Sequence, residues 1–189
     1  RWYPPTTSTT RIFPRIETIV ANANDIREVL PTIDRELTFR FVVRDNHTDA
    51  GAFNFDEIKF NCKASAGPFL VTYPNAAETF AVGDAVTVTW DVANTNLSPV
   101  NCQKVNLHLS TDGGLTYPTL LVADVDNDGT AYVVMPNMPT TTARIRVEAA
   151  DNIFFDISNQ NFTITAATQP GYILTTSPSQ GGLACDEIS

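Results

Sequence analysis

Residues 86–92 read VTVTWDV, and this stretch decides the fold class. Every second residue is apolar, and the residues between are Thr or Asp. Such alternation is typical of a β-strand that has one buried face and one solvent face. Trp90 is the largest side chain on the apolar face, so we expect it to anchor a packed core, with Thr87, Thr89 and Asp91 facing solvent.

The same alternation recurs on both sides of this stretch, and each run is closed by Gly, Pro, Asn or Asp. Short strands at this spacing are the pattern of an antiparallel β-sandwich of the immunoglobulin or fibronectin type. The sequence therefore predicts an all-β protein. The seven strands expected in the sandwich lie within residues 69–73, 86–92, 105–109, 120–122, 133–135, 143–147 and 162–164.

The N-terminal part predicts less regular structure. Residues 37–43 and 58–62 alternate and should form a hairpin joined by RDNHTDAGAFN, residues 44–54. Ile16, Ile19 and Val20 stand at helical spacing after Pro14, which predicts one short helix. Two strands are too few for an independent sheet, so we expect the remaining strands of this unit to lie upstream of Arg1.

These patterns divide the chain into three units in tandem. Residues 1–66 would be the C-terminal part of one β domain, and residues 67–166 the sandwich. Residues 167–189 would be a linker and the start of a further β module. Gly67–Pro68 and the stretch TAATQPGY, residues 165–172, mark the boundaries. No apolar run approaches the ~20 residues that a membrane span needs, and we interpret the chain as a processed piece of a longer protein.

The net charge of −9 is unevenly distributed. Residues 1–66 hold nine Lys or Arg and nine Asp or Glu, whereas residues 67–189 hold three basic and twelve acidic residues. Nucleic-acid binding depends on clustered basic side chains, so nucleic acid is not an expected partner. Anionic membrane surfaces are disfavoured for the same reason.

The three cysteines, Cys62, Cys102 and Cys185, include no C-x-x-C pair, which argues against a zinc site. Two interpretations stay open. A Cys62–Cys102 disulfide would leave Cys185 to pair outside this chain, or all three could be buried thiols.

Asp124, Asp126 and Asp128 copy the start of an EF-hand calcium loop, but Met135 stands where the bidentate Glu belongs. Because residues 127–129 read Asn-Asp-Gly between alternating runs, a hairpin turn is favoured over calcium. A second acidic loop, with Asp45, Asn46 and Asp49, offers no ligand-spacing test. No cofactor is required, and a structural calcium ion is the one alternative.

We expect no catalytic residue in this chain. H-E-x-x-H and G-x-S-x-G are both absent, and the only histidines are His47, in an expected loop, and His108, on the polar phase of a strand. Both are interpreted as solvated. In residues 151–164, Asp156 and Ser158 are expected to accept backbone N–H groups in a tight turn.

The loop LSTDGGLTYP, residues 109–118, looks most like a site. It matches the Asp-box of sialidases, S-x-D-x-G-x-T-W, with Tyr117 in place of Trp. That motif is a structural hairpin in which Ser and Asp side chains tie the turn. Asp112, Gly113 and Gly114 are therefore predicted to be structural, with the glycines at positive φ.

Several stretches together resemble the non-catalytic modules that follow the catalytic domain in secreted reprolysin-like zinc metalloproteases of Bacteroidetes-type bacteria. The resemblance implies a PKD- or cadherin-like first unit, an immunoglobulin-like second unit and type IX secretion. It transfers no protease role to any residue here. The stretches are RIFPRIETI (11–19), EVLPTIDRELTFRFVVRDN (28–46), AGPFLVTYPN (66–75), VTVTWDVANTN (86–96), VNCQKVNLHLSTDGGLTYP (100–118) and TTTARIRVEAADNIFFDISNQNFTI (140–164).

Three functions are compatible with this resemblance. The first is a non-catalytic accessory or stalk region of a secreted or cell-surface protein, with the parent a metalloprotease. The second is an adhesin or self-assembling surface filament, and the third a module of a carbohydrate-active enzyme. Expected partners are neighbouring β modules of the same polypeptide and a surface glycan or protein ligand.

Overall fold

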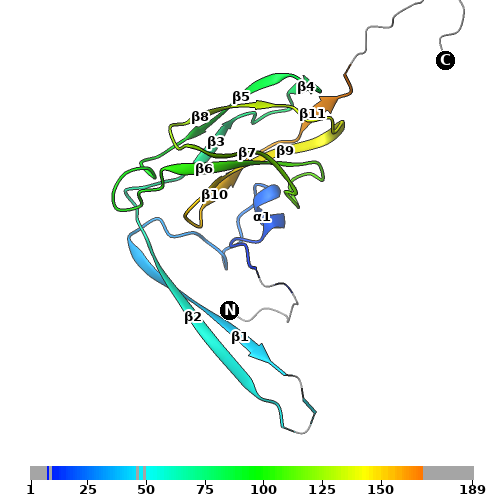
Figure 1. Ribbon diagram of the computed structural model, residues 1–189. Coiled ribbons are helices and arrows are strands. Elements are labelled where there is room, and N and C mark those ends of the chain that lie inside the picture. The colour runs from blue at the N-terminus through cyan, green and yellow to red at the C-terminus, as the bar shows by residue number, and fades with distance from the viewer. Residues whose placement is uncertain (1–7, 9, 46, 49, 168–189) are drawn as a thin grey trace, which may run out of the picture.

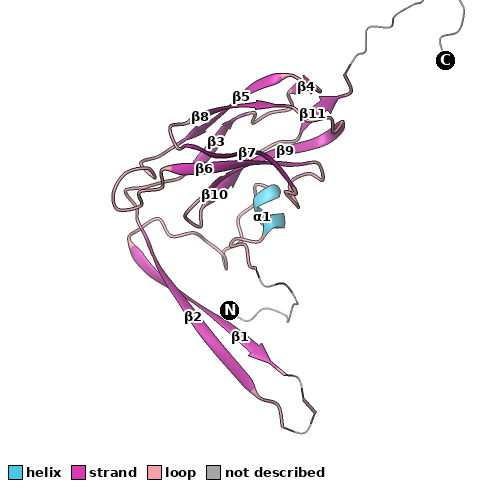
Figure 2. Ribbon diagram, in the orientation of Figure 1, coloured by secondary structure: helices cyan, strands magenta, loops and turns pink. Residues whose placement is uncertain are grey.

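The computed structural model describes residues 8, 10–45, 47, 48 and 50–167, and within them the protein is almost entirely β (Figure 1, Figure 2). The third expected unit lies outside these residues, apart from Ala167. The elements are α1 (Ile16–Val20), β1 (Arg35–Arg44), β2 (Phe53–Cys62), β3 (Leu70–Tyr73), β4 (Thr79–Ala81), β5 (Ala85–Asp91), β6 (Lys104–Ser110), β7 (Thr119–Asp126), β8 (Thr130–Val134), β9 (Thr140–Ala149), β10 (Phe155–Ile157) and β11 (Phe162–Thr165).

Strands β3 to β11 form a sandwich of two sheets. One sheet has the order β3-β5-β8, and the other has the order β4-β11-β9-β6-β7 with β10 also paired to β9. All described pairs in the sandwich are antiparallel except β4 with β11, which is parallel. This is an immunoglobulin-like arrangement, and the predicted all-β sandwich with one short helix is confirmed.

The core of the sandwich follows from the alternation in the sequence. In β5 the side chains of Val86, Val88 and Trp90 are buried between the sheets, whereas Thr87 and Thr89 are half-buried on the other face. β6 and β9 repeat the pattern with Val, Leu, Ile and Ala. Each fully buried Val, Leu or Ile side chain contributes about 1.5–3 kcal/mol relative to an exposed one.

The connection at residues 127–129 differs from the predicted hairpin. β7 pairs with β6 and β8 pairs with β5, so this turn carries the chain from one sheet to the other. The backbone N–H of Trp90 donates to the Gly129 carbonyl at 3.0 Å, and a Cβ on Gly129 would lie 3.1 Å from the backbone oxygen of Trp90. Gly129 has φ +100°, which favours glycine. The prediction of a turn at residues 127–129 is therefore correct, but the prediction that the two strands flanking it pair with each other is wrong.

The predicted N-terminal hairpin is present. β1 and β2 pair antiparallel over ten residues each, from Arg35 opposite Cys62 to Arg44 opposite Phe53. The hairpin projects away from the sandwich as a long arm (Figure 1). Within the described residues, β1 and β2 pair only with each other.

The helix α1 lies against the six-stranded sheet. Arg144 on β9 donates to the Val20 carbonyl at 3.1 Å, and Asn22 donates to the Asn159 carbonyl at 2.8 Å.

Within the described residues, no helix has the length and apolar character to cross a membrane. The sandwich also contains two three-residue strands that the sequence did not predict, β4 and β10.

Candidate functional site

The loop between β6 and β7 is a turn tied by its own side chains. The Ser110 hydroxyl donates to Asp112 Oδ1 at 2.6 Å and accepts the Gly114 N–H at 2.9 Å. Asp112 Oδ1 also accepts the N–H groups of Leu115 and Thr116 at 3.0 Å, and Oδ2 accepts the Thr116 hydroxyl at 2.6 Å. Both carboxylate oxygens are therefore engaged within the turn.

These contacts change the acidity of Asp112. Burial disfavours the charged carboxylate, but the Ser110 and Thr116 hydroxyl groups and the two backbone N–H donors outweigh it and hold the pKa of Asp112 well below its ordinary value. The donors of the turn itself therefore hold this carboxylate in its charged form.

The two glycines of the loop make a close approach possible. Gly113 and Gly114 have φ values of +81° and +95°. A Cβ on Gly114 would lie 3.0 Å from both Arg144 Cδ and Val20 Cγ2, and 3.1 Å from the Tyr117 oxygen. Gly114 therefore lets the loop, α1 and β9 meet at one place.

Beside this loop, the outer face of the six-stranded sheet carries a polar cluster of His108, Tyr117, Arg146, Glu148 and Phe155. His108 Nε2 lies 2.9 Å from Glu148 Oε1, and Arg146 lies 2.8 Å from Oε2. The Arg146 guanidinium stacks over the Tyr117 ring at 4.6 Å and lies 5.6 Å from the Phe155 ring. Burial raises the pKa of the Tyr117 hydroxyl above its ordinary value, with Arg146 opposing the shift.

The position of His108 corrects the sequence interpretation. The side chain was expected to be solvated, but it is only 18% exposed because Arg146 and Glu148 of β9 lie beside it. His108 Nδ1, Tyr117 Oη and Arg146 Nε are buried without a hydrogen-bond partner. His47 lies in the exposed loop between β1 and β2, where its N–H donates to Asp45 at 3.2 Å.

Asp156 and Ser158 each accept a backbone N–H group from another strand. Asp156 on β10 accepts the Val71 N–H of β3 at 2.7 Å, so it links the two sheets. Ser158 accepts the Ile145 N–H at 3.1 Å. Burial raises the pKa of Asp156 above its ordinary value, and the Val71 and Ile157 N–H donors oppose the shift. The neighbouring Phe154 packs against the core at Phe69.

Trp90 is 4% exposed and belongs to a buried polar network that the sequence did not suggest. Its indole N–H donates to Asn127 Oδ1 at 2.9 Å. The Asn127 amide in turn donates to Thr95 Oγ1 and to the Cys102 carbonyl, both at 3.0 Å. Asn127 thus holds the crossover between the sheets to the core.

Cys62 and Cys102 are free thiols, so the disulfide that the sequence left open is not formed between them. Cys102 is buried and its thiol donates to the Lys104 carbonyl at 3.3 Å. Burial, together with the nearby Asp151 carboxylate, raises the pKa of the Cys102 thiol to about 11. Cys62 lies at the end of the hairpin, and Cys185 lies outside the described residues.

The acidic run expected as an alternative calcium site does not converge. Asp126 pairs with Lys104 at 2.6 Å, and Asp128 accepts the Thr130 N–H at 3.1 Å. Asp124 lies within β7, where the register against β6 shifts, and has φ +53°. Across the described part of the chain, no three Asp, Glu, His or Cys side chains lie close enough to share a metal ion. Asn46 and Asp49 of the second acidic loop lie outside that part.

The N-terminal segment contains a buried carboxylate that sequence reasoning missed. Glu28 is buried, and it accepts the Arg11 guanidinium at 2.9 Å and the Arg15 N–H at 2.7 Å. This pairing joins the two ends of the segment around α1. Glu28 stands in no alternating run, so the pattern gave no sign of its burial.

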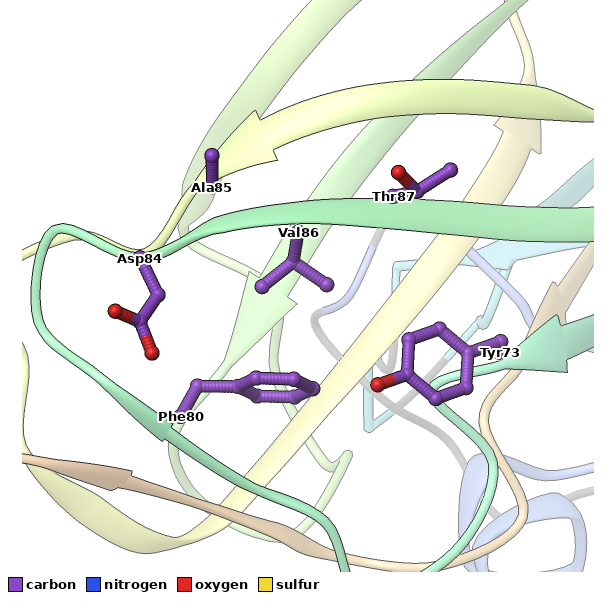
Figure 3. A pocket seen from close by; sticks show the side chains of 6 residues that line it. All are labelled: Tyr73, Phe80, Asp84, Ala85, Val86 and Thr87. Carbon is purple, nitrogen blue, oxygen red and sulfur yellow. The ribbon is translucent and has the colours of Figure 1, made fainter.

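Two hollows open on the surface. One, of about 370 Å³, lies at the edge of the sandwich and is lined by Tyr73, Phe80, Asp84, Ala85, Val86 and Thr87 (Figure 3). The other, of about 230 Å³, lies at the far end of the hairpin and is lined by Arg44, Asp45, Gly51, Ala52 and Phe53.

No protein-family model matches this chain, and no curated protein matches it.

Proposed function

We propose that this chain is a non-catalytic accessory or stalk region of a secreted or cell-surface bacterial protein with several domains, and that the parent is a zinc metalloprotease. The exposed hairpin arm is the observation that carries the proposal. Of the eighteen large apolar residues that are exposed in the described part of the chain, six lie on the hairpin and four more lie between Ile26 and Ile33, just before it. Such a concentration marks an interaction surface.

The two faces of the hairpin differ in chemistry. On one face, Phe39 stacks on Phe60 at 5.3 Å and meets Phe13 at 5.5 Å, so the base of this face is covered. Further out, Phe41 and Ile58 on the same face are 58% and 60% exposed. The opposite face carries ion pairs, Arg40 with Glu57 at 2.5 Å and Glu36 with Lys59 at 3.3 Å. It also carries three exposed apolar side chains, those of Val42, Phe53 and Phe55. Exposed apolar side chains therefore lie on both faces of the hairpin, whereas these ion pairs lie on one.

A neighbouring β module is the partner that fits this arm. An isolated two-stranded hairpin is marginally stable in water, and the outer edges of β1 and β2 present backbone groups without strand partners among the described residues. An adjoining sheet would supply both the missing strands and an apolar layer. The sandwich, whose core is closed, would then serve as a rigid spacer.

The proposal is tested in the parent protein, read from the gene upstream of Arg1. Phe41→Ser with Ile58→Ser should destabilise the longer protein by about 3–6 kcal/mol, because two buried side chains are lost. The same pair in the isolated chain should leave the sandwich melting temperature unchanged. Thr38→Ser with Lys59→Ser, on the charged face, is the matched control. Equal stability of the parent with and without Phe41 and Ile58 would contradict the accessory role, and absence of H-E-x-x-H upstream would contradict the metalloprotease.

The same face supports self-assembly as a second candidate, since two copies could bury it against each other. Concentration-dependent light scattering by the isolated chain, abolished by Phe41→Ser with Ile58→Ser, would favour this candidate. A monomer at all concentrations would favour the accessory region.

A further inference from the structure

As far as the structure describes them, the two sheets of the sandwich end in four strands, β3, β8, β4 and β7, and three of these edges are protected. On β3, the Asp156 carboxylate accepts the Val71 N–H at 2.7 Å. On β4, the Asp84 carboxylate accepts the Ala81 N–H at 2.7 Å. The register of β7 against β6 shifts twice, and β7 carries two exposed aspartates. Side-chain caps, bulges and charges of this kind keep an edge strand from pairing with another chain.

Among the described strands that end these sheets, β8 lacks such protection. Its five residues, TAYVV at 130–134, include no charge and no proline, and its register against β5 is continuous. Tyr132 and Val134 are 79% and 63% exposed, so their side chains are open to a partner. A neutral, regular strand at an open edge is a template for strand pairing.

The backbone hydrogen bonds around β8 show which of its residues face the open edge. Just before β8, Gly129 accepts the backbone N–H of Trp90 at 3.0 Å, and just after it Met135 donates to the Asp84 carbonyl at 2.9 Å. Because residues that bond the partner strand alternate with residues that do not, the odd-numbered residues of β8 also bond β5. The backbone groups that point to the open edge are those of Thr130, Tyr132 and Val134.

These three residues are evenly spaced about Tyr132. The Thr130 N–H donates to Asp128 at 3.1 Å, whereas the N–H groups of Tyr132 and Val134 meet no acceptor within the described part of the chain. An antiparallel copy of the same strand would place Tyr132 opposite Tyr132, and Val134 opposite Thr130. Each Tyr132 would then donate to the Tyr132 carbonyl of the other copy, and each Val134 to the Thr130 carbonyl.

We propose that β8 pairs with β8 of a second copy of this chain about a twofold axis at Tyr132, so that the two three-stranded sheets become one continuous sheet. A twofold interface must be self-complementary. β8 meets this requirement in its backbone groups and, because the strand is neutral, in its side chains. The pairing closes two open edges at once, which a strand from a different protein would not do. The inference concerns the sandwich alone and does not depend on the role of the hairpin.

The first measurement is sedimentation equilibrium of the isolated chain from about 0.01 mM to about 1 mM, because a short edge-to-edge interface is small and therefore weak. The average mass should rise from that of a monomer toward that of a dimer. Each copy has a net charge of −9, so the copies repel each other. Raising the ionic strength from about 0.05 M to about 0.5 M should therefore strengthen the dimer severalfold. A monomer at the highest concentration, or a dimer that salt weakens, would overturn the proposal.

Tyr132→Lys should weaken the dimer at least about tenfold, because the aromatic pair is lost and two like charges stand directly opposite each other. Since the Tyr132 side chain is exposed, the melting temperature of the monomer should not change. Leu70→Lys is the matched control: it brings the same change of charge to the same face of the same sheet, but at the β3 edge, and it should dimerise as the unmutated chain does.

The dimer should also persist in Phe41→Ser with Ile58→Ser, which separates it from assembly through the hairpin. A dimer that survives Tyr132→Lys, or that is lost in the hairpin variant, would contradict pairing through β8.

The register is tested by oxidative cross-linking in a background of Cys62→Ser with Cys185→Ser. Tyr132→Cys should form a disulfide between copies, because residues opposite each other in such a pair have Cα atoms about 5.5 Å apart, within the range that a disulfide spans. Val134→Cys is the control, since its counterpart in the other copy would lie about 13 Å away along the strand. Equal yields of cross-linked dimer from the two variants would rule out the proposed pairing.

Discussion

At the scale of single residues, Asp112 shows how a carboxylate can resemble a site and yet serve the fold. It accepts four hydrogen bonds from its own loop, one from Ser110, one from Leu115 and two from Thr116. Three of these contacts reach Oδ1 and one reaches Oδ2, so both oxygens are tied to the backbone and side chains of the turn. The loop keeps its shape because one side chain satisfies several backbone donors.

Asp112→Ala should destabilise the sandwich by about 1–3 kcal/mol, because the loop loses the acceptor for these donors. The measurement is urea denaturation followed by circular dichroism. Asp126→Ala, which removes only an exposed ion pair with Lys104, is the control and should cost less than about 1 kcal/mol. A smaller loss for Asp112→Ala than for the control would contradict the structural role.

The pH dependence of stability separates Asp112 from Asp156. The pKa of Asp112 is lowered by folding, so its contribution is present above the ordinary value of 3.8 and is lost as pH falls below it. The unmutated chain should therefore be more stable than Asp112→Asn at pH 7, and this difference in stability should shrink in acid. Melting temperatures measured between about pH 2.5 and 7 check this.

Asp156 should behave with the opposite sign. Its pKa is raised, so the folded state binds the proton more tightly and stability falls as pH rises above 3.8. Asp156→Asn should be at least as stable as the unmutated chain at pH 7. In acid, the unmutated chain should become more stable relative to Asp156→Asn. A parallel course of Asp112→Asn and Asp156→Asn with pH would contradict both assignments.

At the scale of elements, strand identity was predictable because the alternation of side chains is a local property. The strands missed, β4 and β10, have three residues each and are too short to show a period. Strand partners are a non-local property, and this is why residues 127–129 were assigned to a hairpin although they cross between sheets. The register shift between Val71 and Tyr73 is also non-local, because it appears only where this strand pairs with β5.

Asn127→Ala should lower the free energy of unfolding by about 2–4 kcal/mol. The indole N–H of Trp90, the Cys102 carbonyl and the Thr95 hydroxyl would each lose a buried hydrogen-bond partner. Chemical denaturation measures the loss. Asn152→Ala is the control, since Asn152 is exposed and bonds only its neighbour's N–H, and it should stay within about 0.5 kcal/mol. Similar losses in the two variants would mean that the network adds no stability.

At the scale of the whole molecule, Arg144 joins the N-terminal segment to the sandwich. Its guanidinium donates to the Val20 carbonyl of α1, to the Ser158 carbonyl and to Asn161 Oδ1 at 3.1, 3.2 and 2.7 Å. Sequence patterns could not show this contact, because 124 residues separate Arg144 from Val20. A buried arginine on β9 that donates to α1 and to the connection between β10 and β11 fixes the position of these segments relative to the sheet.

Arg144→Ala should release α1 from the sheet while the strands stay paired. Hydrogen exchange of the amides of residues 18–23 should accelerate at least about tenfold, since the segment loses its anchoring hydrogen bonds. The amides of β5 and β6 should exchange as before. Lys104→Ala is the control and should leave both regions unchanged, and unaltered exchange in residues 18–23 of Arg144→Ala would show that α1 docks without Arg144.

The buried indole of Trp90 gives the protein an optical reporter of its own. The chain has one other tryptophan, Trp2, outside the described residues. In a Trp2→Phe background, emission would come from the seam between the two sheets alone, and it would shift to the red only when water reaches the indole. Fluorescence would then distinguish the opening of the sandwich from the release of α1, which circular dichroism reports together.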